Sequence, residues 1–289
     1  MSVLHNERTK KGKRSFFPGR GRIAALLLAA AFVAGMMCGC TALRINTDEE
    51  QSEKIIVGID KYEPYTYLDA DGSYAGVDIE IAKQVFHELG YEPEFKFITW
   101  SEKNENLADG TIDCIWSCYS MNGREEKYQW AGPYMYSRQV IAVDADSDIR
   151  TFSDLADKRV GVQTTTRAAG LFLHMTDSEL PKVKEVNCFA STEDMFAALR
   201  KGYVDAVSGH EALLNEFIEN GKGKFRLLDE SPHISQLGVA FEKGTHIELA
   251  QDITRVLTEM TEDGSIGNIA EKYGLDKERV VIGGDTDEK

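Results

Sequence analysis

The order of hydrophobic patterns along this chain predicts an α/β fold. Short runs rich in β-branched residues alternate with longer stretches in which apolar side chains recur at helical spacing. This order is typical of βαβ units and predicts a largely parallel sheet. About 230 residues after residue 53 carry the pattern, enough for one large or two small domains.

The elements are expected in the following order. Lys54–Asp60 is the first strand, and the helix Val77–Leu89 follows it and ends before Gly90, a residue that favours a helix C-terminus. The further predicted strands are Glu94–Ile98, Ile112–Ser117, Val140–Val143, Arg159–Gln163, Val183–Cys188, Val204–Ser208 and Gly238–Phe241. The further predicted helices are Arg167–His174, Ser191–Arg200, Glu211–Glu219 and Ile247–Met260. Their apolar stripes are expected to pack in the core.

The N-terminus has the pattern of an export signal. Residues 1–22 hold seven basic side chains and one acidic side chain, and the apolar run Ile23–Ala34 follows. This run is shorter than the roughly 20 residues that a membrane-spanning helix needs. We therefore expect residues 1–39 to be a cleaved signal peptide.

The segment Met37–Thr41 resembles a lipoprotein signal-peptidase site, because the small residue Gly39 directly precedes Cys40. This resemblance implies a lipid on Cys40 and a polar tether over residues 40–53, which would hold the protein on the outer face of the cell membrane. An ordinary secretory signal, in which Cys38 and Cys40 are incidental, is the alternative.

Composition excludes some partners. The chain has 33 Lys and Arg against 48 Asp and Glu; without residues 1–39 these become 26 and 47, a net charge of about −21. Such a surface repels nucleic acid.

Cys114, Cys118 and Cys188 are expected to be free and buried, since Cys114 and Cys118 lie too far apart along a strand to bridge. The six histidines show no zinc spacing, so we expect no metal site.

Several short motifs follow one another between residues 56 and 264. They are Ile56–Asp60, Tyr62–Tyr65, Gly76–Ala82, Gly110–Asp113, Gly123–Glu125, Trp130–Tyr134, Arg159–Gln163, Gly202–Asp205 and Asp263–Gly264. In this order and spacing they resemble the extracytoplasmic amino-acid-binding proteins of ABC importers, the family-3 solute-binding proteins. The resemblance covers nearly all of the chain after the signal peptide.

The resemblance implies a type II periplasmic-binding-protein fold with two lobes and a ligand cleft between them. Residues 54–138 and 236–282 would form lobe 1, residues 139–235 lobe 2, and residues 283–289 a flexible tail. The two hinge segments would cross near Tyr136–Gln139 and Ser235–Leu237. It further implies that a monomer without a cofactor captures a small amino acid or related carboxylate and delivers it to a membrane permease.

The family's ligand contacts fall on nine residues of this chain. They are Asp60, Tyr62, Trp100, Ser117, Ser120, Arg124, Thr166, Arg167 and His210. Arg124 would bind the ligand carboxylate through its planar guanidinium fork. Tyr62 and Trp100 would form apolar walls, although core packing explains such residues equally well. Thr166 and the helix start that follows it could bind the carboxylate, cap the helix, or do both.

Four features depart from the family pattern and bear on the ligand. The loop between Ser120 and Arg124 is one residue shorter than common, so the alignment of Arg124 depends on a local gap. His210 stands where an aspartate commonly receives the α-ammonium, Arg167 where a small polar residue is usual, and Thr165 where glycine is frequent. Together, His210 and Arg167 predict a preference for ligands with a second acidic or strongly polar group over lysine and arginine. Protonation of His210 would strengthen this preference as the pH falls from about 8 to 6.

Two other functions remain open from the sequence. The same fold hosts exported cyclohexadienyl dehydratases, and Asp205 or Glu211 beside His210 could supply an acid and base pair. A sensor module that binds a ligand without serving an importer is the second alternative. No cofactor or nucleophile motif is present, so the sequence favours a binding protein without catalytic residues.

Overall fold

The computed structural model describes residues 52–174 and 180–281 of the chain. The predicted signal peptide, Cys40, most of the tether and the tail at residues 283–289 lie outside these residues. Within them, strands and helices alternate, and the α/β fold class is confirmed. No helix in the described ranges is long and apolar enough to cross a membrane.

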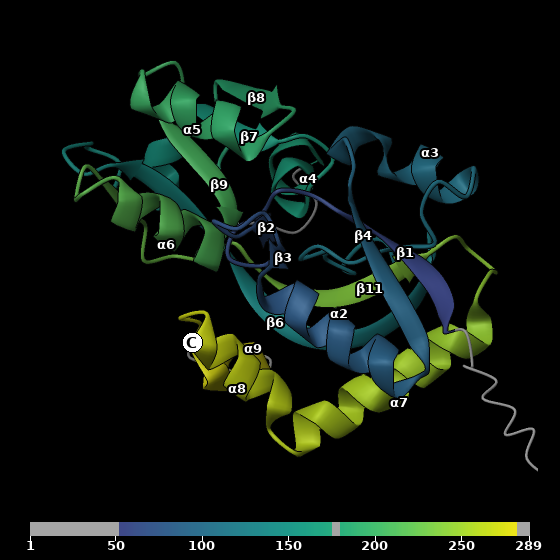
Figure 1. Ribbon diagram of the computed structural model, residues 1–289. Coiled ribbons are helices and arrows are strands. Elements are labelled where there is room, and N and C mark those ends of the chain that lie inside the picture. Colours follow the sequence, from purple (N-terminus) through teal and green to yellow (C-terminus); the bar gives the residue numbers. More distant parts are fainter. Residues whose placement is uncertain (1–51, 175–179, 282–289) are drawn as a thin grey trace, which may run out of the picture. The chain divides into compact units, whose positions relative to one another are not determined.

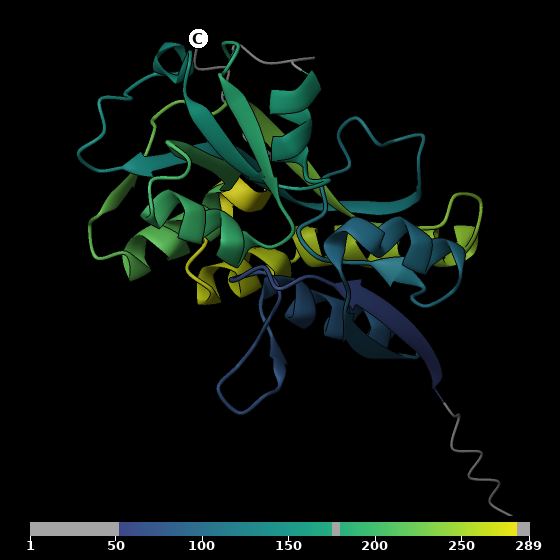
Figure 2. The ribbon, with the colours of Figure 1, turned by 90° about the horizontal axis from the view of Figure 1, so that it is seen from above.

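One large sheet organises the fold (Figure 1). Its strands lie in the order β4 (Tyr91–Phe97), β1 (Glu53–Ile59), β5 (Cys114–Ile115), β11 (His233–Phe241), β6 (Gln129–Asp144), β9 (Ala206–His210), β7 (Arg159–Gln163) and β8 (Glu185–Phe189). β10 (Phe225–Leu227) pairs with β6. The short strands β2 (Tyr67–Leu68) and β3 (Tyr74–Ala75) form a hairpin that projects from the rest of the chain in Figure 2.

The sheet has two parallel halves with an antiparallel middle. β4, β1 and β5 form the first half, and β9, β7 and β8 form the second. β6 and β11 pair antiparallel with each other, with Ser137 opposite Ser235, and join the halves. The expectation of a largely parallel sheet is therefore wrong in the middle. The sequence predicted only the apolar ends of β6 and β11, because polar residues such as Arg138 and Gln139 interrupt the hydrophobic pattern.

Helices cover both halves of the sheet. They are α2 (Val77–Glu88), α3 (Lys103–Ala108), α4 (Arg167–His174), α5 (Thr192–Arg200), α6 (Glu211–Asn220), α7 (Ile247–Glu262), α8 (Ser265–Lys272) and α9 (Lys277–Val281). The five predicted helices are confirmed, and the predicted bounds of α4 agree with the structure. α3 escaped prediction because its six residues contain little apolar repeat, and a 3₁₀ turn, Trp100–Glu102, leads into it.

The apolar stripes of the helices build the core. α7 buries Ile253, Val256 and Leu257 against the sheet, as the sequence pattern predicts.

Cys114 and Cys118 are buried free thiols, which confirms the expectation for both. Cys188 is also free but exposed, so its predicted burial is wrong. It lies on β8, the last strand in the sheet order, where one side of the strand has no neighbouring strand in the described chain.

A buried carboxylate fixes the loop that follows β5. Asp78, near the start of α2, accepts hydrogen bonds from the backbone N–H of Cys118 at 2.5 Å and from the hydroxyl of Tyr134 at 2.7 Å. Gly76 allows the start of α2 to lie against the backbone of Tyr65, because a Cβ there would lie 2.2 Å from the carbonyl oxygen of Tyr65 and its φ is 120°. Burial raises the pKa of Asp78 to about 7.

We expect Asp78→Ala to lower the free energy of unfolding by about 2–4 kcal/mol. The substitution leaves the Cys118 N–H and the Tyr134 hydroxyl buried without their acceptor. Urea unfolding measures the change, and Asp252→Ala on the exposed side of α7 is the matched control, which should not destabilise the protein. Equal unfolding midpoints for Asp78→Ala and the wild type would contradict this role.

Candidate functional site

A small cavity brings together all nine sequence-predicted ligand residues. It has about 310 Å³ of empty space, including its open mouth, and Cys118, Tyr119 and Gln163 complete its lining. The nine predicted residues in the lining are Asp60, Tyr62, Trp100, Ser117, Ser120, Arg124, Thr166, Arg167 and His210. The lining therefore draws on segments that lie up to 150 residues apart in the sequence.

The cavity lies where parallel strands of both halves end. Asp60 directly follows β1, and Ser117 follows β5 in the same half of the sheet. Gln163 is the last residue of β7, and His210 is the last residue of β9. Polar side chains collect there because the carboxyl ends of parallel strands in open α/β sheets leave a crevice that suits a ligand.

Arg124 connects the cavity to the far side of the cleft. Its guanidinium donates to the carbonyl oxygens of Ser120 at 2.9 Å and Thr165 at 3.2 Å. The guanidinium carbon lies 5.0 Å from the ring centroid of Tyr119, a cation–π distance. These contacts hold a half-buried cation at the cavity with no ion pair to any acidic side chain of the described chain.

Asp60 supplies the negative charge of the cavity. Its carboxylate accepts from the backbone N–H of Lys61 at 2.9 Å and from Nε2 of Gln163 at 2.5 Å. Burial is the main reason that the pKa of Asp60 is raised to about 6, and the Gln163 hydrogen bond opposes the shift. At pH 7 the carboxylate is therefore mainly ionised.

Sequence reasoning missed Gln163 as a site residue. A polar residue at the end of a buried strand was the available signal, and the residue's side chain is only 3% exposed. Its Oε1 is buried without a hydrogen-bond partner in the described part of the chain, and so is Nε1 of Trp100. The cavity lining thus holds one acceptor and one donor that can each make a further hydrogen bond.

His210 lines the cavity in its uncharged form. The imidazole is buried and lies within 3.1 Å of Nε2 of Gln139, which also donates to Ser235. Burial, aided by Arg124, lowers the pKa of His210 to about 3. The expected protonation of His210 between pH 8 and 6 is therefore wrong, because the sequence does not reveal how completely this side chain is desolvated.

The hydroxyl groups in the lining make local hydrogen bonds. Ser117 Oγ accepts from the backbone N–H of Asp60 at 3.1 Å and lies 2.9 Å from Thr66 Oγ1. Thr166 Oγ1 donates to the Gln163 carbonyl at 2.7 Å and accepts from the Ala169 N–H at 3.2 Å. Thr166 therefore caps α4, and its hydroxyl can also face the cavity that it lines.

Direct contacts join the two halves of the sheet across the cavity. Asp60 bonds to Gln163, and Arg124 and Lys103 both bond to Thr165, with Lys103 Nζ 2.6 Å from Thr165 Oγ1. At the rim, Lys61 Nζ lies 2.7 Å from a carboxylate oxygen of Glu193. The structure is thus a closed arrangement, in which residues after β1 and β5 touch residues after β7.

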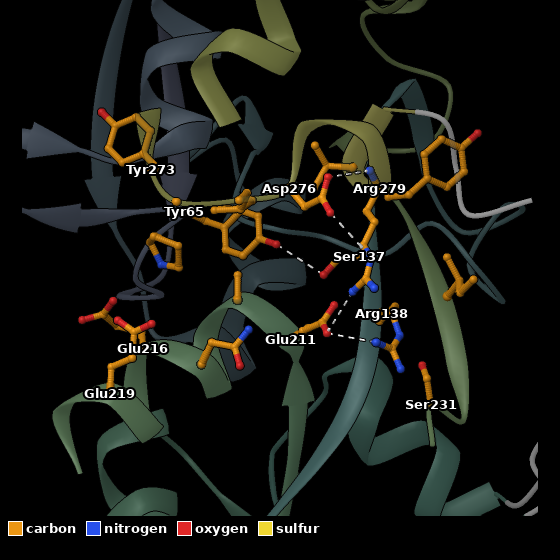
Figure 3. Close-up of a pocket in the computed structure, with 18 of the residues that line it drawn as sticks. Tyr65, Ser137, Arg138, Glu211, Glu216, Glu219, Ser231, Tyr273, Asp276 and Arg279 are labelled. Carbon is orange, nitrogen blue, oxygen red and sulfur yellow. Dashed lines mark hydrogen bonds and ion pairs between the residues drawn. The ribbon is translucent and has the colours of Figure 1, made fainter. Parts of the chain in front are cut away.

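A second, larger hollow lies between α6 and α9 and contains none of the nine residues (Figure 3). Its wall holds Glu211, which accepts from Arg138 at 3.0 Å and lies 3.8 Å from Arg279. Elsewhere, Asp205 pairs with Arg159 at 2.6 Å, which lowers the pKa of Asp205. Neither acid lines the small cavity, so the acid and base pair proposed beside His210 is not assembled.

The geometry of the small cavity suits capture of a zwitterion. Arg124 offers a cationic fork, Asp60 offers a carboxylate on the other side, and Tyr62 and Trp100 supply aromatic walls. No group of three or more side chains that could hold a metal ion occurs in the described ranges. The lining thus offers polar groups of both charges and aromatic surfaces to a small molecule.

Known proteins resemble this chain in sequence and in fold. The profile of the bacterial extracellular solute-binding proteins, family 3, matches residues 55–276. The L-cystine-binding protein TcyA of Bacillus subtilis (strain 168) is 24% identical over 265 residues, which cover 87% of this chain and 96% of TcyA.

Two solved structures extend the comparison. A substrate-binding protein of an ABC uptake transporter from Streptococcus pneumoniae with bound histidine has a TM-score of 0.71 and 26% identity, covering 77% of this chain and 93% of that one. An ancestral amino acid-binding protein, a precursor of cyclohexadienyl dehydratase, has a TM-score of 0.68 and 27% identity, covering 78% and 96%.

Proposed function

This chain belongs to the bacterial extracellular solute-binding proteins of family 3, and from that membership we propose that it captures a small amino acid or related carboxylate for an ABC importer. Its fold is the two-lobe type II fold of periplasmic binding proteins. The observation that carries the proposal is the convergence of the nine residues on one small, closed cavity.

The cavity suggests how the ligand is oriented. The α-carboxylate pairs with Arg124 in a bidentate ion pair. The α-ammonium binds Asp60 and the unpaired Oε1 of Gln163, which together replace the aspartate that His210 displaces. The ligand side chain then lies against Tyr62 and Trp100.

Charge around the cavity favours a ligand with a second acidic or strongly polar group. Arg167 adds a cation to the lining, whereas His210 is neutral and contributes no negative charge. L-cystine, for which one relative is named, is strongly polar at its far end, which carries a second carboxylate together with a second ammonium group. We therefore take glutamate as the first probe and lysine as its counterpart.

Closure of the hinge would enclose the ligand between the two lobes before it reaches the permease. We propose that residues 54–138 and 236–282 form one lobe and residues 139–235 the other, with β6 and β11 as the crossing segments. The antiparallel pairing of residues 136–139 with residues 233–236 supports this division, because it is where the chain passes between the halves of the sheet. A membrane permease would receive the closed complex.

The proposal describes a binding protein and not an enzyme. The two acids that could have acted with His210 are engaged in ion pairs with Arg159 and Arg138. The likeness to a dehydratase precursor is a likeness to an amino acid-binding protein. Turnover of prephenate or arogenate by the purified protein would contradict this assignment.

We expect Arg124→Ala and Arg124→Lys to weaken glutamate binding by about thirtyfold or more. Alanine removes the carboxylate partner, and lysine restores only a point charge without the planar fork. Titration calorimetry measures the affinity, and Arg255→Ala on the exposed face of α7 is the control, which should bind as the wild type does. Wild-type affinity in both Arg124 variants would refute this orientation of the ligand.

We further propose that the protein is exported and held at the outer face of the cell membrane by a lipid on Cys40. The basic and apolar order of residues 1–34 and the small Gly39 before Cys40 support this proposal. In cells fed labelled palmitate, Cys40→Ala should abolish the label and release the protein from the membrane fraction, while Cys38→Ala should do neither. A labelled, membrane-bound Cys40→Ala variant would overturn the assignment.

A further inference from the structure

Lys103 is a buried cation without a counterion, placed directly behind the cavity wall. The residue is only 1% exposed, yet its ammonium donates to the Trp100 carbonyl at 3.0 Å and to Thr165 Oγ1 at 2.6 Å, two uncharged groups. It forms no ion pair in the described chain. A buried charge without an opposite charge is costly, so this position calls for an explanation.

Two aromatic rings of the cavity lining lie against the ammonium. Its nitrogen lies 4.6 Å from the centroid of a Trp100 ring and 5.7 Å from that of Tyr119, and both side chains line the cavity. Cation–π contacts of this kind offset only part of the cost of burying the charge. The uncompensated positive charge therefore lies behind the wall of the cavity in which we propose that the ligand binds.

The charges around Lys103 add to this deficit. Arg124 and Lys127, both between β5 and β6, repel the ammonium, and Asp60 after β1 is the acidic side chain that attracts it. Burial, reinforced by these two cations, lowers the pKa of Lys103 to about 7. Two cations and one carboxylate thus act on the Lys103 ammonium, so positive charge exceeds negative charge near it.

We propose that Lys103 is a specificity-determining residue that recognises the second acidic group of the ligand. This inference rests on the proposed function and narrows its ligand class to amino acids with an anionic side chain. The α-carboxylate pairs with Arg124, and a second carboxylate against the Trp100 and Tyr119 rings attracts the Lys103 ammonium behind them. The hydrogen bond to Thr165, a residue of the opposite half, holds the cation next to the cavity wall in this structure.

Glutamate and glutamine provide the matched ligand pair, because they differ in side-chain charge and little in size. We expect the wild type to bind glutamate at least about tenfold more tightly than glutamine. Lys103→Met and Lys103→Gln should reduce this ratio to near one, chiefly through weaker glutamate binding. Gln retains a donor for Thr165 Oγ1, so it separates the charge of Lys103 from its hydrogen bond.

Lys83→Met is the control, because Lys83 also lies over an aromatic ring, that of Phe95, but on the exposed surface. Its ratio should equal that of the wild type, and thermal melts verify that all variants fold. A wild-type ratio near one, an undiminished ratio in Lys103→Gln, or an equal loss for both ligands in Lys103→Met would overturn the assignment. If the wild type binds neither ligand nor any other amino acid, the proposed function itself fails.

Discussion

Closing the cleft brings buried positive charge from one half of the molecule against the other, and much of the site depends on how this charge is compensated. Lys103 and Arg124 both bond to Thr165 across the cavity, and neither forms an ion pair with an acidic side chain of the described chain. Hydrogen bonds to uncharged groups stabilise the positions of these cations but do not neutralise them. Under our proposal, an anionic ligand supplies the missing negative charge, and closure and ligand capture are then coupled through the same electrostatic interaction.

The scaffold makes this coupling possible. β6 and β11 pair with each other in the middle of the sheet and carry the chain between the two parallel halves, so the halves can move about few covalent connections. Asp78 holds the loop after β5 through Cys118, which fixes Ser117 and Ser120 from one side. The opposite wall comes from the ends of β7 and β9. The residues that line the cavity therefore come from both halves of the sheet.

The nine residues that the family resemblance suggested as ligand contacts line one cavity, and their role in ligand binding stays a prediction. The middle of the sheet was missed because Ser137, Arg138 and Gln139 look like a loop although β6 continues through them. The neutral state of His210 and the burial of Lys103 were also missed, since desolvation depends on packing by residues distant in sequence. Sequence motifs indicate which residues lie near one another, whereas only the fold shows how buried they are and how their pKa values shift.

A distance measurement across the cleft tests the central claim most directly. Spin labels on Ala108→Cys of α3 and Lys201→Cys after α5, in a Cys188→Ser background, report the separation of the two halves by pulsed electron paramagnetic resonance. We predict a longer and broader distance distribution without ligand, and a shorter, narrow one with saturating glutamate. An identical distribution with and without a ligand that calorimetry shows to be bound would contradict closure around the ligand.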